Sequence, residues 1–144
     1  MPHIVINYSA NLDTQTNMQM LCHALADTLL SQRAEDGSAV FAPGGVRVFA
    51  YPAPHCAIAD GGAVAMESGG NGDYGFVYIN LRMGRGRSSV VHTKVGDALL
   101  ACASDHLHPL FDTQYLGLTV QIDESPGQVY DGKRSTLHPL FQNS

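Results

Sequence analysis

The chain has 144 residues, about the length of one ordinary domain. Charged residues make up 15% of it, below the share of about 25% in typical soluble domains, so we expect an oligomer that buries part of each subunit surface. A formal net charge of −5 argues against a nucleic-acid partner. The sequence has no apolar run of the roughly 20 residues that a membrane span needs, and its start lacks the basic segment of a signal peptide. We therefore expect a cytoplasmic protein.

The first half of the chain predicts a strand, a helix and a second strand. Residues 3–8 are β-branched and aromatic, which is typical of a strand. A helix capped by Thr14 or Thr16 and ending near Gln32 is indicated by apolar residues at the three-and-four spacing of one buried face, namely Met18, Leu21, Cys22, Leu25 and Leu29. Strand character resumes at residues 46–51.

The second half repeats this order after a glycine-rich segment, residues 59–72, which predicts a mobile surface loop or hairpin. Residues 73–83 form the strongest strand pattern in the sequence. Ser88 is a suitable cap for a second helix, and we expect Pro109 to stop that helix. Residues 115–123 predict the final strand.

This repeated order predicts the fold class. Parallel strands need a crossover helix, so the sequence indicates an α+β fold in which two βαβ units form a four-stranded mixed sheet with two helices on one face. We expect residues 1–124 to form a single domain with halves at about 2–58 and 73–124. Residues 125–144 would form an irregular tail that can reach a neighbouring subunit. The sheet face without helices would be buried against other subunits.

Pro2 is the first candidate for a catalytic residue, because removal of the initiator methionine would leave it as the amino terminus. A terminal amine acts as a general base only when it is unprotonated, whereas ordinary α-amino groups titrate at about 7.7–8.0. Desolvation in an apolar pocket and nearby cations would both lower its pKa. The alternative is that the chain begins with Met-Pro for no catalytic reason.

Three arginines are candidates for binding an anion. The turn at residues 83–88 combines glycines, a helix start and the side chains of Arg85 and Arg87, and an arginine can grip a carboxylate through two parallel hydrogen bonds. The alternative is a tight turn with two solvated arginines. Arg47 lies within a predicted strand, where it either meets a charged ligand in a pocket or pairs with an acidic residue of its own chain.

No metal site is predicted. His92, Cys102, His106 and His108 can be imagined as ligands, but their spacing matches no known zinc pattern. The three cysteines form no CxxC pattern, so we expect reduced thiols. Cys22 and Cys102 fall on apolar helical faces that are typical of core positions.

Four segments of the chain carry a resemblance to known proteins, namely the start Met-Pro-His-Ile-Val, the Gly-Val-Arg of residues 45–47, residues 74–88 with their Gly-Arg-Gly-Arg-Ser ending, and the last predicted strand at 116–124. Together they resemble the 5-carboxymethyl-2-hydroxymuconate isomerase family of the tautomerase superfamily. The resemblance runs from Pro2 to about Glu124 with gaps. Its most specific piece is the strand that leads into Gly-Arg-Gly-Arg-Ser.

This resemblance implies a homotrimer of duplicated βαβ units with Pro2 as the catalytic base. Arg47 and Arg87 match the family's arginines that bind substrate carboxylates, and Arg85 beside Arg87 is a second candidate for that clamp. The implied reaction moves a proton from the enol hydroxyl of a carboxylated 2-hydroxymuconate to a distant carbon, which gives the conjugated keto isomer during the breakdown of aromatic compounds. The substrate would be a small dicarboxylate or tricarboxylate, and no metal or organic cofactor is needed.

Two other functions fit the same residues. In hydratase or dehalogenase branches of the superfamily, a protonated proline amine or an activated water acts on unsaturated acids, which predicts activity on a haloacrylate and none on a dienol. In a non-catalytic trimeric anion-binding protein, Arg47 and Arg87 would hold a carboxylate without turnover. Binding would then survive blocking of the terminal amine.

Overall fold

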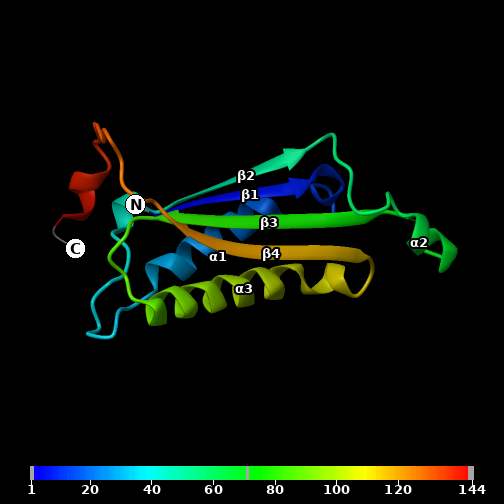
Figure 1. Ribbon diagram of the computed structural model, residues 1–144, viewed down its shortest axis with the longest axis horizontal. Coiled ribbons are helices and arrows are strands. Elements are labelled where there is room, and N and C mark those ends of the chain that lie inside the picture. Colours follow the sequence, from blue (N-terminus) through cyan, green and yellow to red (C-terminus); the bar gives the residue numbers. More distant parts are fainter. Residues whose placement is uncertain (1, 71, 143–144) are drawn as a thin grey trace.

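The centre of the structure is a four-stranded mixed sheet with the strand order β2-β1-β3-β4 (Figure 1). The computed structural model describes residues 2–70 and 72–142. β1 pairs in parallel with β2, β3 pairs in parallel with β4, and the antiparallel pairing of β1 with β3 joins the two halves. The strands are β1 (His3–Ser9), β2 (Arg47–Ala53), β3 (Tyr74–Met83) and β4 (Tyr115–Glu124).

Two long helices cover one face of this sheet. α1 (Met18–Leu30) and α3 (Ser89–Phe111) each connect two parallel strands, and both lie on the same side (Figure 1). The predicted α+β fold of two βαβ units is therefore confirmed. Neither long helix covers the opposite side, which we call the open face. No helix within residues 2–70 and 72–142 has the length and apolarity needed to cross a membrane.

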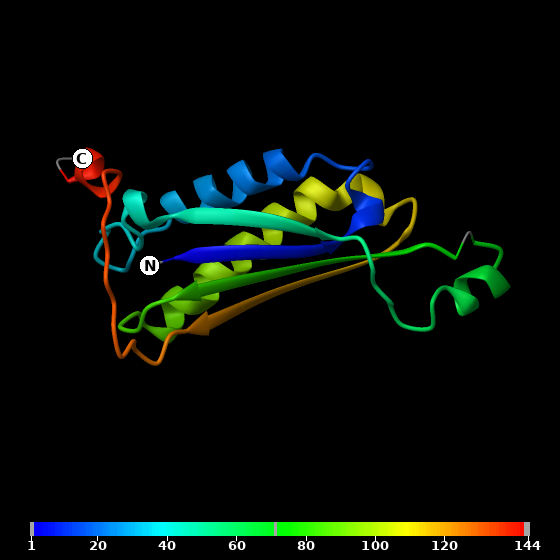
Figure 2. The same ribbon diagram turned by 90° about the horizontal axis from the view of Figure 1, so that it is seen from above.

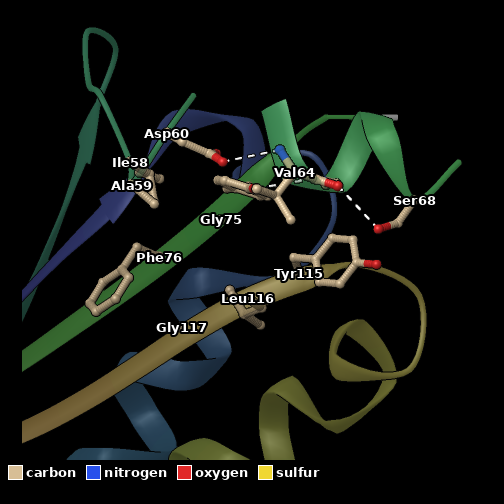
Figure 3. Close-up of a pocket in the computed structure, with 12 residues that line it drawn as sticks. Ile58, Ala59, Asp60, Val64, Ser68, Gly75, Phe76, Tyr115, Leu116 and Gly117 are labelled. Atoms are coloured by element: carbon tan, nitrogen blue, oxygen red, sulfur yellow. Dashed lines mark hydrogen bonds between the residues drawn. The ribbon is translucent and has the colours of Figure 1, made fainter. Parts of the chain in front are cut away.

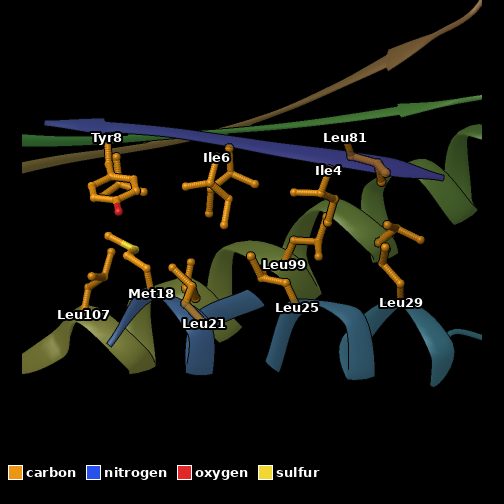
Figure 4. Packing of buried hydrophobic residues seen from close by; sticks show 14 of the residues in the cluster. Ile4, Ile6, Tyr8, Met18, Leu21, Leu25, Leu29, Leu81, Leu99 and Leu107 are labelled. Carbon is orange, nitrogen blue, oxygen red and sulfur yellow. The ribbon is translucent and has the colours of Figure 1, made fainter. Parts of the chain in front are cut away.

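The core lies between the sheet and the two helices. Successive strand residues point to opposite faces, and Ile4, Ile6 and Tyr8 of β1 are buried on the helix side (Figure 4). They meet the apolar faces of both helices, which carry Leu21, Leu25 and Leu29 on α1 and Val95, Leu99 and Leu107 on α3. The apolar spacing that predicted the first helix thus corresponds to its buried face.

The predicted cap of the first helix is wrong. Asn17, not Thr14 or Thr16, caps α1, and its side chain accepts a hydrogen bond from the backbone N–H of Met20 at 3.0 Å. The hydroxyl of Thr16 is engaged elsewhere, because it lies 2.9 Å from Nε2 of His106 on the other long helix. A local hydrogen bond of Asn17 therefore caps the helix, while Thr16 contacts a distant segment.

The second long helix begins as predicted but ends later. Ser88 caps α3 by accepting a backbone hydrogen bond at 3.3 Å. Pro109, which we expected to stop the helix, lies inside it, and α3 continues to Phe111. Proline removes one helical hydrogen bond. The burial of Leu107 and the packing of Leu110 against the core hold the last turn in place.

The glycine-rich segment predicted as a loop or hairpin contains a short helix, α2 (Ala63–Glu67), which the sequence patterns missed. The carboxylate of Asp60 accepts hydrogen bonds from the N–H groups of Gly62 at 2.9 Å and Val64 at 3.0 Å. One side chain thus satisfies amide groups at the start of the helix. The segment projects beyond the sheet end at which β3 begins (Figures 1 and 2).

The carboxy-terminal tail folds back along its own chain. From the end of β4, residues 125–137 cross the sheet end at which β1 begins, and we call this segment the strap (Figure 2). It leads into a 3-10 helix, η3 (His138–Phe141), that contacts a second one, η2 (Pro43–Gly45), just before β2. The fit is close, because a Cβ at Gly44 would lie 3.1 Å from Cα of His138. The expected contact of the tail with a neighbouring subunit stays a prediction.

Candidate active site

A cavity of about 620 Å³ lies on the open face, at the sheet end where β1 begins. His3 of β1, Arg47 of β2, the end of β3 with the turn after it, and the strap all line it. Four of the chain's eight lysines and arginines belong to this lining, namely Arg47, Arg82, Arg85 and Lys133. Among its described lining residues, only Asp131 is acidic. We call this cavity the arginine pocket.

The sheet register brings these cations together. His3 lies opposite Arg47 on one neighbouring strand and opposite Arg82 on the other. Residues directly opposite one another point to the same face, so the three side chains gather on the open face. Ile4, the next residue of β1, points into the core instead.

Arg47 is held by polar contacts inside the arginine pocket. Its Nε donates a hydrogen bond to Nδ1 of His3 at 2.9 Å, and its Nη1 donates one to the carbonyl oxygen of Gly45 at 3.3 Å. Burial, and secondly the Arg47 guanidinium, lower the pKa of His3, which suits a neutral imidazole that accepts this bond. The ion pairs found among residues 2–70 and 72–142 do not include Arg47. These two bonds use only part of its donor capacity, so donors remain for a carboxylate.

The two arginines of the turn after β3 lie in different places. Arg85 lines the arginine pocket and donates a hydrogen bond to the carbonyl oxygen of Pro126 in the strap. Arg87 donates to the carbonyl oxygens of Gly84 and Val40, both at 3.0 Å. It lines a separate cavity of about 390 Å³. The structure therefore groups Arg47 with Arg85 and leaves Arg87 apart.

Pro2 is buried immediately before β1. Because His3 faces the open side, strand alternation places Pro2 on the helix side, with Ile4. Arg87 lies toward this side as well, since its guanidinium stacks at 5.0 Å over the ring of Phe41, a fully buried core residue. One chain thus carries Pro2 and Arg87 on the helix side, and Arg47 and Arg85 on the open face.

The histidines and cysteines do not assemble into a metal site in the described part of the chain. Within residues 2–70 and 72–142, no group of three or more histidine, cysteine, aspartate and glutamate side chains is placed to hold a metal ion. His92 lies 2.5 Å from Glu124, whereas His108 lies 3.8 Å from Asp112. Cys102, like Cys22, packs against the hydrophobic core as expected.

A cavity of about 660 Å³ lies at the opposite end of the sheet (Figure 3). It sits between the segment that carries α2 and the beginnings of β3 and β4, and its apolar walls include Ile58, Val64 and Leu116. Asp60 and two tyrosines are its ionisable residues, and no lysine, arginine or histidine is among the lining residues described. We call it the apolar pocket. Its described lining residues offer no cation to a carboxylated ligand.

Sequence reasoning missed part of the arginine pocket. Strand alternation could have placed Arg82 on the face opposite Leu81, because both lie in the strongest predicted strand. No sequence pattern indicated that Lys133 lines the pocket, since its position depends on how the tail folds back over the sheet end. His3 was assigned only to a strand, although the same alternation puts it beside Arg47.

A family model described as 5-carboxymethyl-2-hydroxymuconate isomerase matches residues 2–141. A 5-carboxymethyl-2-hydroxymuconate Delta-isomerase from Escherichia coli is 24% identical over 142 residues, which cover 99% of this chain and 100% of that protein. The match includes the strap and η3, which lie beyond the resemblance found in the sequence.

Two solved structures are similar over nearly the whole chain. The crystal structure of a 5-carboxymethyl-2-hydroxymuconate delta-isomerase has a TM-score of 0.95 and 51% identity, covering 99% of this chain and 93% of that one. The structure of a 5-carboxymethyl-2-hydroxymuconate isomerase from Deinococcus radiodurans R1 has a TM-score of 0.78 and 29% identity, covering 98% of this chain and 94% of that one. The protein therefore belongs to the 5-carboxymethyl-2-hydroxymuconate isomerase family and is an isomerase.

Proposed function

We propose that the protein is a cofactor-independent tautomerase that converts a carboxylated 2-hydroxymuconate-type dienol to its keto isomer in the breakdown of aromatic compounds. The observation that carries this proposal is the position of Pro2, which is buried immediately before His3, a lining residue of the arginine pocket. The named relatives act on a muconate with an added carboxymethyl group, which is a small polycarboxylate. The negative charge of the proposed substrate is therefore complementary to the positive charge of this end of the sheet.

Pro2 would act as the base once it is the free amino terminus. Pro2 is buried, and burial disfavours the ammonium form of an amine. A neighbouring arginine would disfavour that form further and so favour the neutral amine that proton transfer needs. The amine would take the proton of the enol hydroxyl and deliver it to the distant carbon of the conjugated system. Arginine side chains would stabilise the negative charge that spreads over the dienolate during this transfer.

Arg87 and Arg47 would bind the substrate carboxylates, and we propose that they reach one substrate from different copies of the chain. Within one chain they line separate cavities. Strand alternation puts Pro2 on the helix side of the sheet, toward which Arg87 also lies. The open face that carries Arg47 also exposes aromatic side chains, with Phe49 exposed by 46% and Tyr51 by 52%. A homotrimer that covers this face would bury these rings and carry Arg47 to the Pro2 of a neighbour.

The first test compares protein whose free Pro2 is verified by mass with a variant that carries one alanine before Pro2. Ketonisation of 2-hydroxymuconate-type dienols is followed by ultraviolet absorbance. We expect turnover by the free-proline protein and none by the blocked variant, because an amide nitrogen is not a base. Equal turnover by both proteins would reject the role of Pro2. Turnover of a haloacrylate without turnover of any dienol would replace the isomerase proposal with hydratase or dehalogenase chemistry.

A subunit-mixing experiment tests the shared site. Neither the blocked variant nor Arg47→Ala should be active alone. Co-expression of the two would allow a mixed oligomer in which one copy supplies Pro2 and Arg87 while another supplies Arg47. Recovery of part of the wild-type activity supports the shared site. Co-purified mixed oligomers without activity would place all three residues in the site of one copy.

A further inference from the structure

The first residues of the strap are hydrogen-bonded to the end of the sheet. The N–H of Ser125 donates a hydrogen bond to the carbonyl oxygen of Met83 at 2.8 Å, and Arg85 donates to the carbonyl oxygen of Pro126. Gly127 then turns with a φ of +114°, a conformation that favours glycine, and a Cβ there would lie 3.0 Å from Nη2 of Arg85. These contacts fix where the strap leaves β4.

The strap is attached again beyond the pocket, where η3 contacts η2. Ser135 supports this second attachment, because its hydroxyl oxygen accepts hydrogen bonds from the N–H groups of Leu137 at 3.0 Å and His138 at 3.1 Å. Between the two attachments the strap contributes Gln128, Asp131 and Lys133 to the lining of the arginine pocket. A segment held at both ends thus presents a lysine to a cavity that already contains Arg47.

The cations of this pocket differ in the partners that they already bind. Arg47 is bonded to His3, and Arg85 is bonded to the strap itself. Lys133 forms an ion pair with Asp131, two residues earlier on the same strap, and its side chain is 47% exposed. An ion pair between partly exposed side chains contributes little stability, so a ligand carboxylate can replace or share it.

We infer that Lys133 is a specificity-determining residue that binds a carboxylate of the substrate beyond those held by the arginines, and that the strap places it there. This inference rests on the carboxylate-binding part of the proposed function, because it requires Arg47 to hold another carboxylate of the same ligand. It holds whichever copy of the chain supplies Pro2, since Lys133 and Arg47 line one pocket. Lys133 would therefore distinguish a tricarboxylate from a dicarboxylate.

The test measures binding of two unreactive probes, tricarballylate and glutarate, by isothermal titration calorimetry at low salt. Lys133→Gln is compared with wild type and with Arg134→Gln, which removes the same charge from the next residue, outside the pocket lining. We expect Lys133→Gln to weaken tricarballylate binding about tenfold and glutarate binding less than about threefold. Arg134→Gln should change both affinities less than about threefold.

A second variant tests the same contact in the opposite direction. Asp131→Asn removes the carboxylate that competes for Lys133, so tricarballylate should bind more tightly than to wild type. Equal losses in Lys133→Gln and Arg134→Gln, equal effects on both probes, or no binding of either probe to wild type would each overturn the inference.

Kinetics separate this inference from the proposed function. With a tricarboxylate dienol as substrate, Lys133→Gln should raise KM and leave kcat nearly unchanged, because Lys133 takes no part in proton transfer. A selective loss of tricarballylate binding in a protein that isomerises no dienol would support the inference and reject the proposed function. Normal isomerisation with no selective loss in Lys133→Gln would reject the inference alone.

Discussion

The two ends of the sheet carry cavities of similar volume and opposite character. The arginine pocket, of about 620 Å³, is lined by four lysines and arginines. The apolar pocket, of about 660 Å³, has none among its described lining residues. A net charge of −5 for the chain therefore says little about the field at one site, because half of its eight lysines and arginines gather at one end. Volume alone does not separate the two cavities, whereas their charge does.

The ends also differ in how they are built. The apolar pocket forms between the glycine-rich segment that follows β2 and the strands β3 and β4. The arginine pocket instead combines two strands of the first half, the end of β3 with the turn after it, and the strap after β4. Only the second arrangement collects functional groups from both halves of the duplicated fold. We therefore expect substitutions at the two ends to affect activity very differently.

The largest expected effect is that of Arg47→Gln at the arginine pocket. Loss of a charged partner for a substrate carboxylate should reduce transition-state stabilisation by about 2–5 kcal/mol, which is roughly 30-fold to several thousand-fold in kcat/KM. Lys94→Gln, on the exposed side of α3, removes the same charge far from either pocket and should leave kcat/KM within about twofold. Steady-state kinetics of both variants check this, and equal losses would show that only the overall charge matters.

The next effect separates the two arginines of the turn. Arg87→Gln should lower kcat/KM by roughly 10- to 1,000-fold, because Arg87 lies on the side of Pro2. Arg85→Gln should have a smaller effect, felt mainly as a higher KM through the loosened strap. Arg87 also donates hydrogen bonds to two backbone carbonyl oxygens, so its loss can destabilise the fold. Thermal unfolding must therefore show that each variant is folded. A larger loss in Arg85→Gln would make Arg85 the second carboxylate clamp.

A smaller effect concerns the titration of His3. Its pKa lies below the ordinary value of about 6.5, first because of burial and second because of Arg47. Arg47→Gln should raise this pKa part of the way back, which NMR titration of the imidazole would detect; an unchanged pKa would exclude the contribution of Arg47. The depressed pKa also links the stability of the fold to pH. The neutral form of His3 contributes to the free energy of unfolding above about pH 6.5, and this contribution is lost as the pH falls through the folded-state pKa.

The smallest effect is expected at the apolar pocket. Val64→Ser replaces an exposed side chain of α2 and should leave kcat/KM within about twofold, because Pro2 lies at the other end of the sheet and no lysine or arginine is among the described lining residues of this pocket. The free energy of unfolding should change by less than about 1 kcal/mol. A tenfold loss of activity would contradict the comparison, since it would show that the apolar end takes part in the reaction.

The fold could be predicted from local patterns because each element carries its own signal. The strand patterns and the three-and-four apolar spacing of the first helix predicted the order of elements. A strand, a helix and a strand in that order predicted each pair of parallel strands. Helix ends were predicted less well, since several neighbouring residues can cap a helix and since packing against the core can extend one. Thr16 bonds to His106 on the other long helix, and α3 continues past Pro109 because its last turn packs on the core.

The pentapeptide Leu-His-Pro-Leu-Phe shows the limit of local sequence. At residues 107–111 it completes α3 with Leu107 fully buried, whereas at 137–141 it leads into and forms η3, with Leu137 exposed by 52%. The same five residues thus end an α-helix in one place and make a 3-10 turn in the other. Their surroundings decide the difference, because burial against the core stabilises the helical turn only in the first copy.

The sequence by itself determined the two βαβ units, the family, and the candidates Pro2, Arg47, Arg85 and Arg87, because these follow from short-range patterns and from the spacing of residues along strands and turns. Only the tertiary structure decided which of these residues share a cavity. It grouped Arg47 with Arg85, set Arg87 on the side of Pro2, and brought Lys133 to the first pair. Strand register and the return path of the tail control these positions, and neither is encoded in any single segment.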